Sequence, residues 1–97
     1  MKKIELERSV QSKIVADVAS VDGLACKVIP FNIIGIPDLI IALPGTGVFF
    51  VEVKKEDGAT SKIQDAVIAK LKRLGIHVYV VYGIMGWVEL RKKLLNK

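Results

Sequence analysis

Two apolar segments joined by a tight turn constrain the fold of this chain more than any other feature. Residues 38–43 (DLIIAL) and 48–54 (VFFVEVK) both have β-strand character, and residues 44–47 (PGTG) between them are typical of a hairpin turn. Alternation along the second segment places Glu52 and Lys54 on the same face. Both faces of that segment begin apolar, which predicts a strand in the centre of a sheet. The hairpin therefore carries an acid and a lysine together on a central strand.

Periodicity assigns the rest of the chain to helices and two further strands. A Ser61-x-x-Gln64 capping box begins one helix, and Gly75 follows its end. The predicted order is helix, three strands, helix, strand and helix. The helices are expected at residues 4–20, 61–74 and 86–95, and the strands at 25–29, 38–43, 48–54 and 77–82. A meander followed by a helical crossover predicts an α/β fold with a mixed four-stranded sheet flanked by helices and an extra C-terminal helix.

The hairpin register decides whether Asp38 joins the acid and the lysine. A three-residue turn of residues 44–46 places Asp38 opposite Glu52, and one of residues 45–47 places it opposite Lys54. A four-residue turn instead moves Asp38 to the other face. Glycine at the left-handed position of a three-residue turn favours the shared face without excluding the longer turn. We expect two carboxylates and a lysine to lie together.

Two carboxylates side by side repel each other, and each raises the pKa of the other. A divalent cation with oxygen ligands removes this conflict. Asp and Glu without His or Cys suit Mg²⁺ or Mn²⁺ better than Zn²⁺. A metal beside Lys54, in a chain with 15 basic and 10 acidic residues, suits attack of water on a phosphodiester bond. The predicted activity is hydrolysis of a nucleic acid.

Two polar side chains lie in the apolar face of the first helix. Glu7 and Gln11 fall between Val10, Ile14 and Val18 on that face. A buried, unpaired carboxylate is costly, so Glu7 meets a partner or a functional pocket, or the first turn projects past the core into water. The sequence leaves both interpretations open.

These patterns together resemble a known family of nucleases. The residues Gly35-Ile36-Pro37-Asp38 and Glu52-Val53-Lys54 resemble the motif of the PD-(D/E)XK nuclease superfamily, whose core is the restriction-endonuclease-like αβββαβ fold. Glu7-x-x-x-Gln11 and Ser61-x-x-Gln64 narrow the resemblance to the VRR-NUC (virus-type replication and repair nuclease) family. The resemblance covers residues 7–82.

The resemblance implies a role for each matching residue. Glu7, Asp38, Glu52 and the carbonyl of Val53 are implied metal ligands, Lys54 is the implied catalytic lysine, Gln64 completes the catalytic set, and Gln11 and Ser61 support it. It also implies an Mg²⁺- or Mn²⁺-dependent deoxyribonuclease that cuts branched DNA such as four-way (Holliday) junctions, an activity of DNA repair. Small stand-alone members in phages and bacteria look like junction-cutting homodimers. The basic residues expected to contact DNA are Lys55, Lys62, Arg91, Lys92 and Lys93.

Length and composition are consistent with that reading and exclude other classes. Ninety-seven residues with 52% apolar content predict one domain, residues 1–97. The longest stretch without a charged residue, 74–88, is too short to span a bilayer. A lone Cys26 forms no internal disulfide, which suits the cytoplasm of a bacterial or phage-infected cell. We expect DNA as the partner, no membrane and a homodimer.

Three alternatives remain open. An archaeal-type junction resolvase shares the two acids and the lysine. A non-catalytic DNA-binding module could use the same fold, although it has no need of carboxylates beside phosphate. A register that separated Asp38 from Glu52 would instead favour an α/β interaction domain.

Overall fold

Three helices and four strands make up the part of the chain that the structure describes. A computed structural model describes the backbone of residues 2–95 and the side chains of residues 7–95. The elements are α1 (Lys2–Ala19), β1 (Leu24–Lys27), β2 (Leu39–Leu43), β3 (Gly47–Lys54), α2 (Lys62–Arg73), β4 (Val78–Tyr82) and α3 (Gly83–Leu95). Their order confirms the predicted helix, three strands, helix, strand and helix.

The strands form one mixed sheet in the order β1-β2-β3-β4. Strands β1, β2 and β3 pair antiparallel as a meander, and β4 pairs parallel with β3 after the crossover through α2. Strand β3 therefore lies inside the sheet with a neighbour on each side. This confirms the mixed four-stranded α/β fold and the central position of β3.

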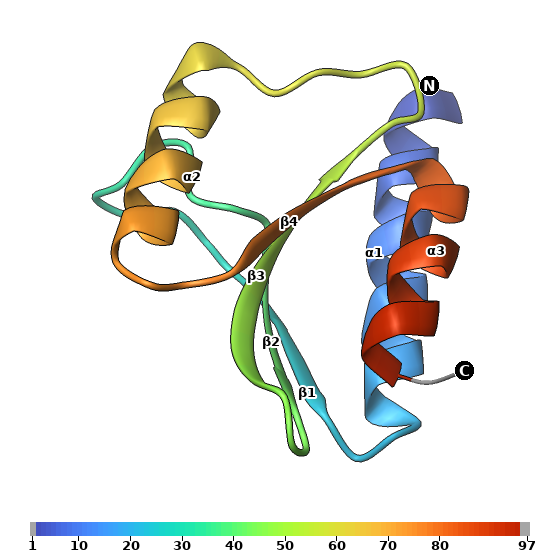
Figure 1. The fold of residues 1–97 in the computed structure, drawn as a ribbon. Helices are drawn as coiled ribbons and strands as arrows, with labels where there is room; N and C mark the ends of the chain where they lie inside the picture. Colours follow the sequence, from blue (N-terminus) through green and yellow to red (C-terminus); the bar gives the residue numbers. More distant parts are fainter. Residues whose placement is uncertain (1, 96–97) are drawn as a thin grey trace.

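The helices cover the two faces of the sheet unequally. Helices α1 and α3 lie side by side against one face, whereas α2 covers part of the other (Figure 1). The core lies between the sheet and the helix pair, where Trp87 of α3 is fully buried. The other buried core residues are Val10, Ile14, Val18, Leu39, Ile41, Leu43, Phe49, Val51, Val53, Val81 and Leu95. Ile4, which periodicity also places in the apolar arc of α1, has a side chain outside the described residues.

The hairpin between β2 and β3 adopts one of the two three-residue registers. Leu43 pairs with Gly47, so the turn is residues 44–46, and Leu39 pairs with Val51. The next pair along the sheet would be Asp38 and Glu52, as the first register predicts. The register that separates these acids is excluded.

Helix α2 has the ends that its sequence predicts. The Ser61 hydroxyl accepts from the Gln64 N–H, and the Gln64 side chain accepts from the Ser61 N–H, which closes the capping box. At the other end Gly75 adopts φ +87°, and Ile76 N–H donates to the carbonyl of Leu71. The N-terminus of α2 is thus fixed beside the sheet, which matters for the site described below.

Three details differ from the predicted elements. Strand β1 ends at Lys27 rather than residue 29. The N–H of Val28 still donates to the carbonyl of Asp38, just before β2, but Pro30 has no N–H with which to continue the ladder. Helix α3 begins at Gly83, directly after β4, instead of at residue 86. Ile63 and Leu74 are exposed although they lie on the apolar stripe of α2, because α2 covers only part of its sheet face. No helix among the described residues combines the length and apolarity that a membrane span requires.

Candidate active site

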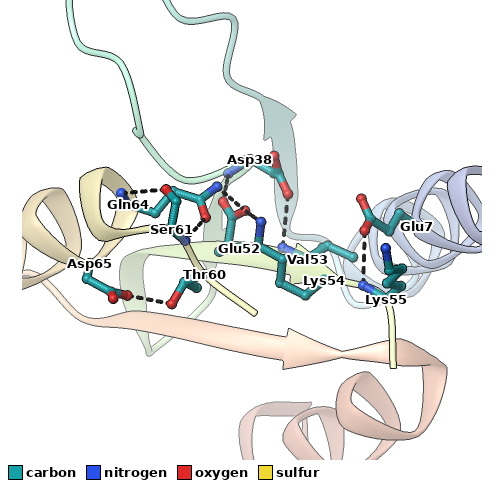
Figure 2. A network of polar contacts seen from close by, with 10 residues as sticks. All are labelled: Glu7, Asp38, Glu52, Val53, Lys54, Lys55, Thr60, Ser61, Gln64 and Asp65. Atoms are coloured by element: carbon teal, nitrogen blue, oxygen red, sulfur yellow. Dashed lines mark hydrogen bonds and ion pairs between the residues drawn. The ribbon is translucent and has the colours of Figure 1, made fainter. Parts of the chain in front are cut away.

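The two acids of the hairpin are locked together at the end of β2 and β3. The N–H of Asp38 donates to Glu52 Oε1 over 3.2 Å, and the N–H of Val53 donates to Asp38 Oδ2 over 2.9 Å (Figure 2). Each carboxylate thus accepts a backbone hydrogen bond from the opposite strand. This exchange of hydrogen bonds holds the two side chains at neighbouring positions.

Glu52 is the buried charged group at the centre of the site. Its side chain is 3% exposed, and its Oε2 accepts from the Gln64 amide over 2.9 Å. Lys54 Nζ lies 3.5 Å from the same oxygen. Gln64 therefore has two roles at once: its amide oxygen caps α2 and its amide nitrogen holds Glu52. The start of α2 is tied to β3 through one side chain.

Burial raises the pKa of Glu52 above its ordinary value, and the negative charge of Asp38 raises it further. Lys54 opposes both effects, because its positive charge and hydrogen bond favour the ionised carboxylate. The net direction is upward. An ionised Glu52 is thus held at a cost to the fold, which is typical of groups that act in chemistry or bind cations.

Replacing Asp38 by asparagine should lower the pKa of Glu52 toward its ordinary value, because one repelling charge is removed. In the wild type the folded state holds the Glu52 proton more tightly than the unfolded state, so stability falls as pH rises from the ordinary to the raised pKa. The free energy of unfolding of the Asp38→Asn protein should fall less steeply over this pH range. Urea denaturation in EDTA across that pH range measures the difference.

Asp22→Asn is the matched control for this experiment. Asp22 is an exposed turn residue with φ +64°, a conformation that asparagine also tolerates. Its replacement removes the same charge away from the hairpin. Equal slopes of stability against pH in wild type and Asp38→Asn would contradict the coupling between the two acids.

Glu7 of α1 is held at the end of β3 rather than left in solvent. Its Oε2 accepts from the backbone N–H of Lys55 over 3.1 Å, one residue beyond the strand that carries Glu52 and Lys54. Gln11, one turn further along α1, accepts from Lys27 Nζ over 3.0 Å. Its supporting role toward Glu7 stays a prediction.

The loop before Asp38 packs against the start of α2. A Cβ at Gly35, which has φ +93°, would lie 2.8 Å from the side chain of Ile63, so a larger residue would push the loop and α2 apart. Pro37 is fully buried. The backbone carbonyl of Asp38 accepts a hydrogen bond from the N–H of Val28 over 2.7 Å, which closes the base of the loop. The Gly-x-Pro-Asp pattern thus positions the first acid of the hairpin.

The basic residues expected to contact DNA lie in two places. Lys55 and Lys62 flank the site, after β3 and at the start of α2. Arg91, Lys92 and Lys93 lie on the last turns of α3, near the end of α1 opposite the site (Figure 1). Arg91 is committed to an ion pair with Asp17, and Lys92 lies 3.9 Å from Glu89. Their contacts with DNA remain predictions.

Among residues 7–95 the side chains form no group of three or more His, Cys, Asp or Glu placed to hold a metal ion together. The donors at the hairpin, Asp38, Glu52 and the carbonyl of Val53, are nevertheless all oxygens. Magnesium ions are commonly held by one or two carboxylates, with waters and substrate phosphates as the other ligands. A carboxylate pair in which Glu52 is buried and has a raised pKa fits such a cation, which would relieve the repulsion.

One polar contact beside the site was missed by the sequence analysis. Lys27 at the end of β1 bonds Gln11 across 16 residues of sequence, and nothing in the pattern around Lys27 marks it. Only the folded arrangement of α1 against β1 brings the two together.

Known proteins resemble this chain in sequence and in structure. The VRR-NUC domain family matches residues 5–85. "Putative nuclease p44" of Acyrthosiphon pisum secondary endosymbiont phage 1 is 32% identical over 75 residues, which cover 77% of this chain and 81% of that protein. A solved structure described as a VRR_NUC domain superposes with a TM-score of 0.77 at 27% identity, covering 93% of this chain and 94% of the other.

Proposed function

The chain belongs to the VRR-NUC family of nuclease domains, and on that premise we propose that it is a metal-dependent DNA endonuclease that prefers branched DNA such as four-way junctions. The observation that carries the chemical part is the interlocked pair Asp38 and Glu52 beside Lys54. A phage relative favours action in the cytoplasm of a bacterial or phage-infected cell.

The proposed cation ligands are Asp38, Glu52 and the carbonyl of Val53. Glu7 forms no three-acid cluster with Asp38 and Glu52 among the described side chains, so its role as a further ligand stays a prediction. A divalent cation at such a site neutralises charge on phosphate oxygens and lowers the pKa of a bound water. The carboxylates of Asp38 and Glu52 each accept a hydrogen bond from a backbone N–H, and these bonds keep both carboxylates in place before substrate binds. Preorganisation of this kind avoids rearrangement during the reaction.

Lys54 and Gln64 both act on the Glu52 side of the site. As an ammonium, Lys54 can orient the attacking water or stabilise the negative charge that develops on the phosphate; as a neutral amine, it can accept a proton from that water. Gln64 holds one oxygen of Glu52, so the carboxylate presents a fixed orientation. Ser61 fixes Gln64 in turn through the capping box. These four side chains are the proposed catalytic and supporting set on this side.

The test of the proposal is cleavage of an end-labelled four-way DNA junction beside a linear duplex of matched sequence. Reactions contain Mg²⁺, Mn²⁺ or EDTA, and the Lys54→Ala protein is the control. We expect paired cuts near the crossover that require metal and are absent with the variant. Cutting of linear duplex or flaps alone would contradict the junction preference. Tight binding without any cutting would favour a non-catalytic DNA-binding module.

We also propose that the protein acts as a homodimer, since two symmetric cuts across a junction need two sites. The loop between β1 and β2 exposes a set of large apolar side chains, with Phe31 97% exposed and Ile29 82% exposed. Exposed apolar clusters of this kind mark association surfaces. A second copy of the chain is the proposed occupant.

Phe31→Ser should convert the dimer into a monomer and abolish paired cutting, as measured by light scattering and by junction cleavage. Met85→Ser is the matched control, because Met85 on α3 is also exposed but lies on a different element. A wild-type protein that is monomeric at working concentration would contradict the dimer. A monomer produced only by Met85→Ser would assign the interface to α3.

A further inference from the structure

A surface pocket of about 650 Å³ borders the candidate active site on the side of α1. It lies between α1 and the sheet, and Glu7 forms part of its wall. The described residues that line it are Glu7, Arg8, Gln11, Ser12 and Val15 from α1, with Lys27 and Leu39 from the sheet. Its volume falls in the range of small-molecule sites, roughly 300–1,000 Å³. The pocket is therefore large enough for part of a nucleotide.

The charges of the pocket suit an anion. Arg8 and Lys27 are cations, and Gln11 and Ser12 carry neutral hydrogen-bonding groups. Glu7 is the acid among the described lining residues, and its Oε2 is already bonded to the backbone of β3's end. A phosphate group in the pocket would meet the positive side chains of Arg8 and Lys27.

Lys27 is held in place although it lies at the surface. Its ammonium donates to Gln11 Oε1 over 3.0 Å, which fixes a side chain that is otherwise among the most mobile. Lys27 also pairs in the sheet with Leu39, the residue after Asp38. Lys27 is thus one register position from Asp38 but on the face of the sheet that carries Leu39 and α1, whereas alternation directs Asp38 to the opposite face; the pocket meets the candidate site through Glu7.

We propose that this pocket binds a backbone phosphate of the DNA strand being cut, next to the scissile phosphate. Arg8 and Lys27 are its cationic ligands, and Gln11 is the positioning residue for Lys27. The inference rests on the proposed nuclease function, because the pocket and the active site share Glu7. Contacts of this type set register and orientation on DNA and carry no base specificity.

The first test measures binding, not cleavage. The Lys54→Ala protein in EDTA is titrated with fluorescent junction DNA at several salt concentrations, with and without Lys27→Gln. Lys27→Gln should weaken binding and reduce the slope of log K against log salt by about 0.9, the value for one lost phosphate contact. Lys13→Gln is the control, since Lys13 is on α1, the helix that lines the pocket, but it pairs with Asp17 over 3.2 Å and is not among the described lining residues. An unchanged slope with Lys27→Gln would overturn the proposal.

The second test locates the phosphate. Neutral methylphosphonates replace one phosphate at a time around the cut site. Methylphosphonate at the phosphate that contacts Lys27 should weaken binding to the wild-type site but not to the Lys27→Gln protein. Methylphosphonates at the other positions should weaken binding equally in both proteins. If every methylphosphonate weakens binding by the same factor in both proteins, Lys27 contacts none of them and the proposal fails.

The positioning role of Gln11 has its own readout. Gln11→Leu should weaken binding when Lys27 is present and have no further effect in Lys27→Gln, because it acts through that lysine. Equal losses in both backgrounds would contradict this role. Circular dichroism and thermal melting confirm that each variant is folded before binding is measured.

These binding measurements separate the inference from the proposed function. A protein that never cuts DNA but shows the Lys27-specific phosphate effect would retain the pocket and lose the nuclease proposal. A protein that cuts junctions without that effect would retain the nuclease and lose the pocket. A wild-type chain that binds no DNA would overturn both.

Discussion

We expect the Lys54→Met protein to cut DNA about 10²- to 10⁴-fold more slowly than the wild type, the loss seen when one positioned acid, base or charge-stabilising group is removed. Methionine retains most of the volume and removes the positive charge. Lys54 Nζ lies 3.5 Å from Oε2 of the buried Glu52, and its side chain is 18% exposed, so circular dichroism and thermal melting check that the variant is folded before rates are measured. Single-turnover rates at saturating enzyme measure the chemical step without the binding step.

Two routes to this loss can be separated by pH. Lys54 lowers the pKa of Glu52 against burial and against the charge of Asp38. Its removal should therefore raise the pKa of Glu52 further. If Lys54 served only to keep Glu52 ionised, the variant would recover its activity at higher pH. A rate that stays low at high pH assigns Lys54 a direct role at the water or the phosphate.

The controls for this prediction use other lysine positions and another cation. Lys70→Met changes an exposed lysine on α2 and should leave the cleavage rate unchanged. Lys54→Arg keeps the charge and loses the ability to accept a proton, so partial activity would favour charge stabilisation over general-base action. Full activity in Lys54→Met would refute the catalytic assignment of Lys54.

The hairpin and the first acids were predictable because their geometry is local. A short turn sets which residues of the two strands lie opposite each other, and strand alternation sets the face to which each side chain points. The sequence left two three-residue registers and one four-residue register open, and the structure selects the one that pairs Leu43 with Gly47. Ser61 and Gln64 were predictable for the same reason, since a capping box spans only four residues.

Contacts between distant segments were beyond the sequence. Periodicity marked Glu7 as a polar residue on an apolar face, but only packing of α1 shows that it meets the backbone of Lys55, 48 residues away. The bond between Gln11 and Lys27 is hidden for the same reason. The exposure of Ile63 follows from how little of its sheet face α2 covers, which the pattern along one helix does not encode.

The ion-pair network between α1 and α3 is another contact of this kind. Trp87 is fully buried, and its Nε1 donates to Asp17 Oδ2 over 2.8 Å. Arg91 donates to the same oxygen over 2.8 Å, and Lys13 lies 3.2 Å from Oδ1. One carboxylate therefore joins the two helices that cover the core, about 15 Å along α1 from Glu7 at 1.5 Å per residue.

We expect Asp17→Ala to lower the free energy of unfolding by about 2–4 kcal/mol, because it leaves the buried Trp87 N–H and the partly buried Arg91 guanidinium without their acceptor. The loss is a large share of the stability of a small domain, roughly 5–15 kcal/mol. Urea denaturation at neutral pH measures it. Lys13→Ala, which removes only the exposed partner of the same carboxylate, should cost far less, about 0–1 kcal/mol. Equal losses for both variants would show that the buried contacts add nothing.

Asp17 and Glu52 change the stability of the fold in opposite directions as pH changes, because the pKa of Asp17 is lowered and that of Glu52 is raised. Burial would raise the pKa of Asp17, but hydrogen bonds from Trp87, Arg91 and Lys13 outweigh it and lower the pKa below its ordinary value. The unfolded state then binds the proton more tightly, so this contribution is present at neutral pH and lost as pH falls through the folded pKa.

Glu52 acts in the opposite direction, since its raised pKa makes the ionised fold less stable as pH rises. Asp17→Ala should therefore flatten the acid side of the stability curve, whereas Asp38→Asn changes the side above the ordinary carboxyl pKa. An acid limb unchanged by Asp17→Ala would contradict the lowered pKa of this carboxylate.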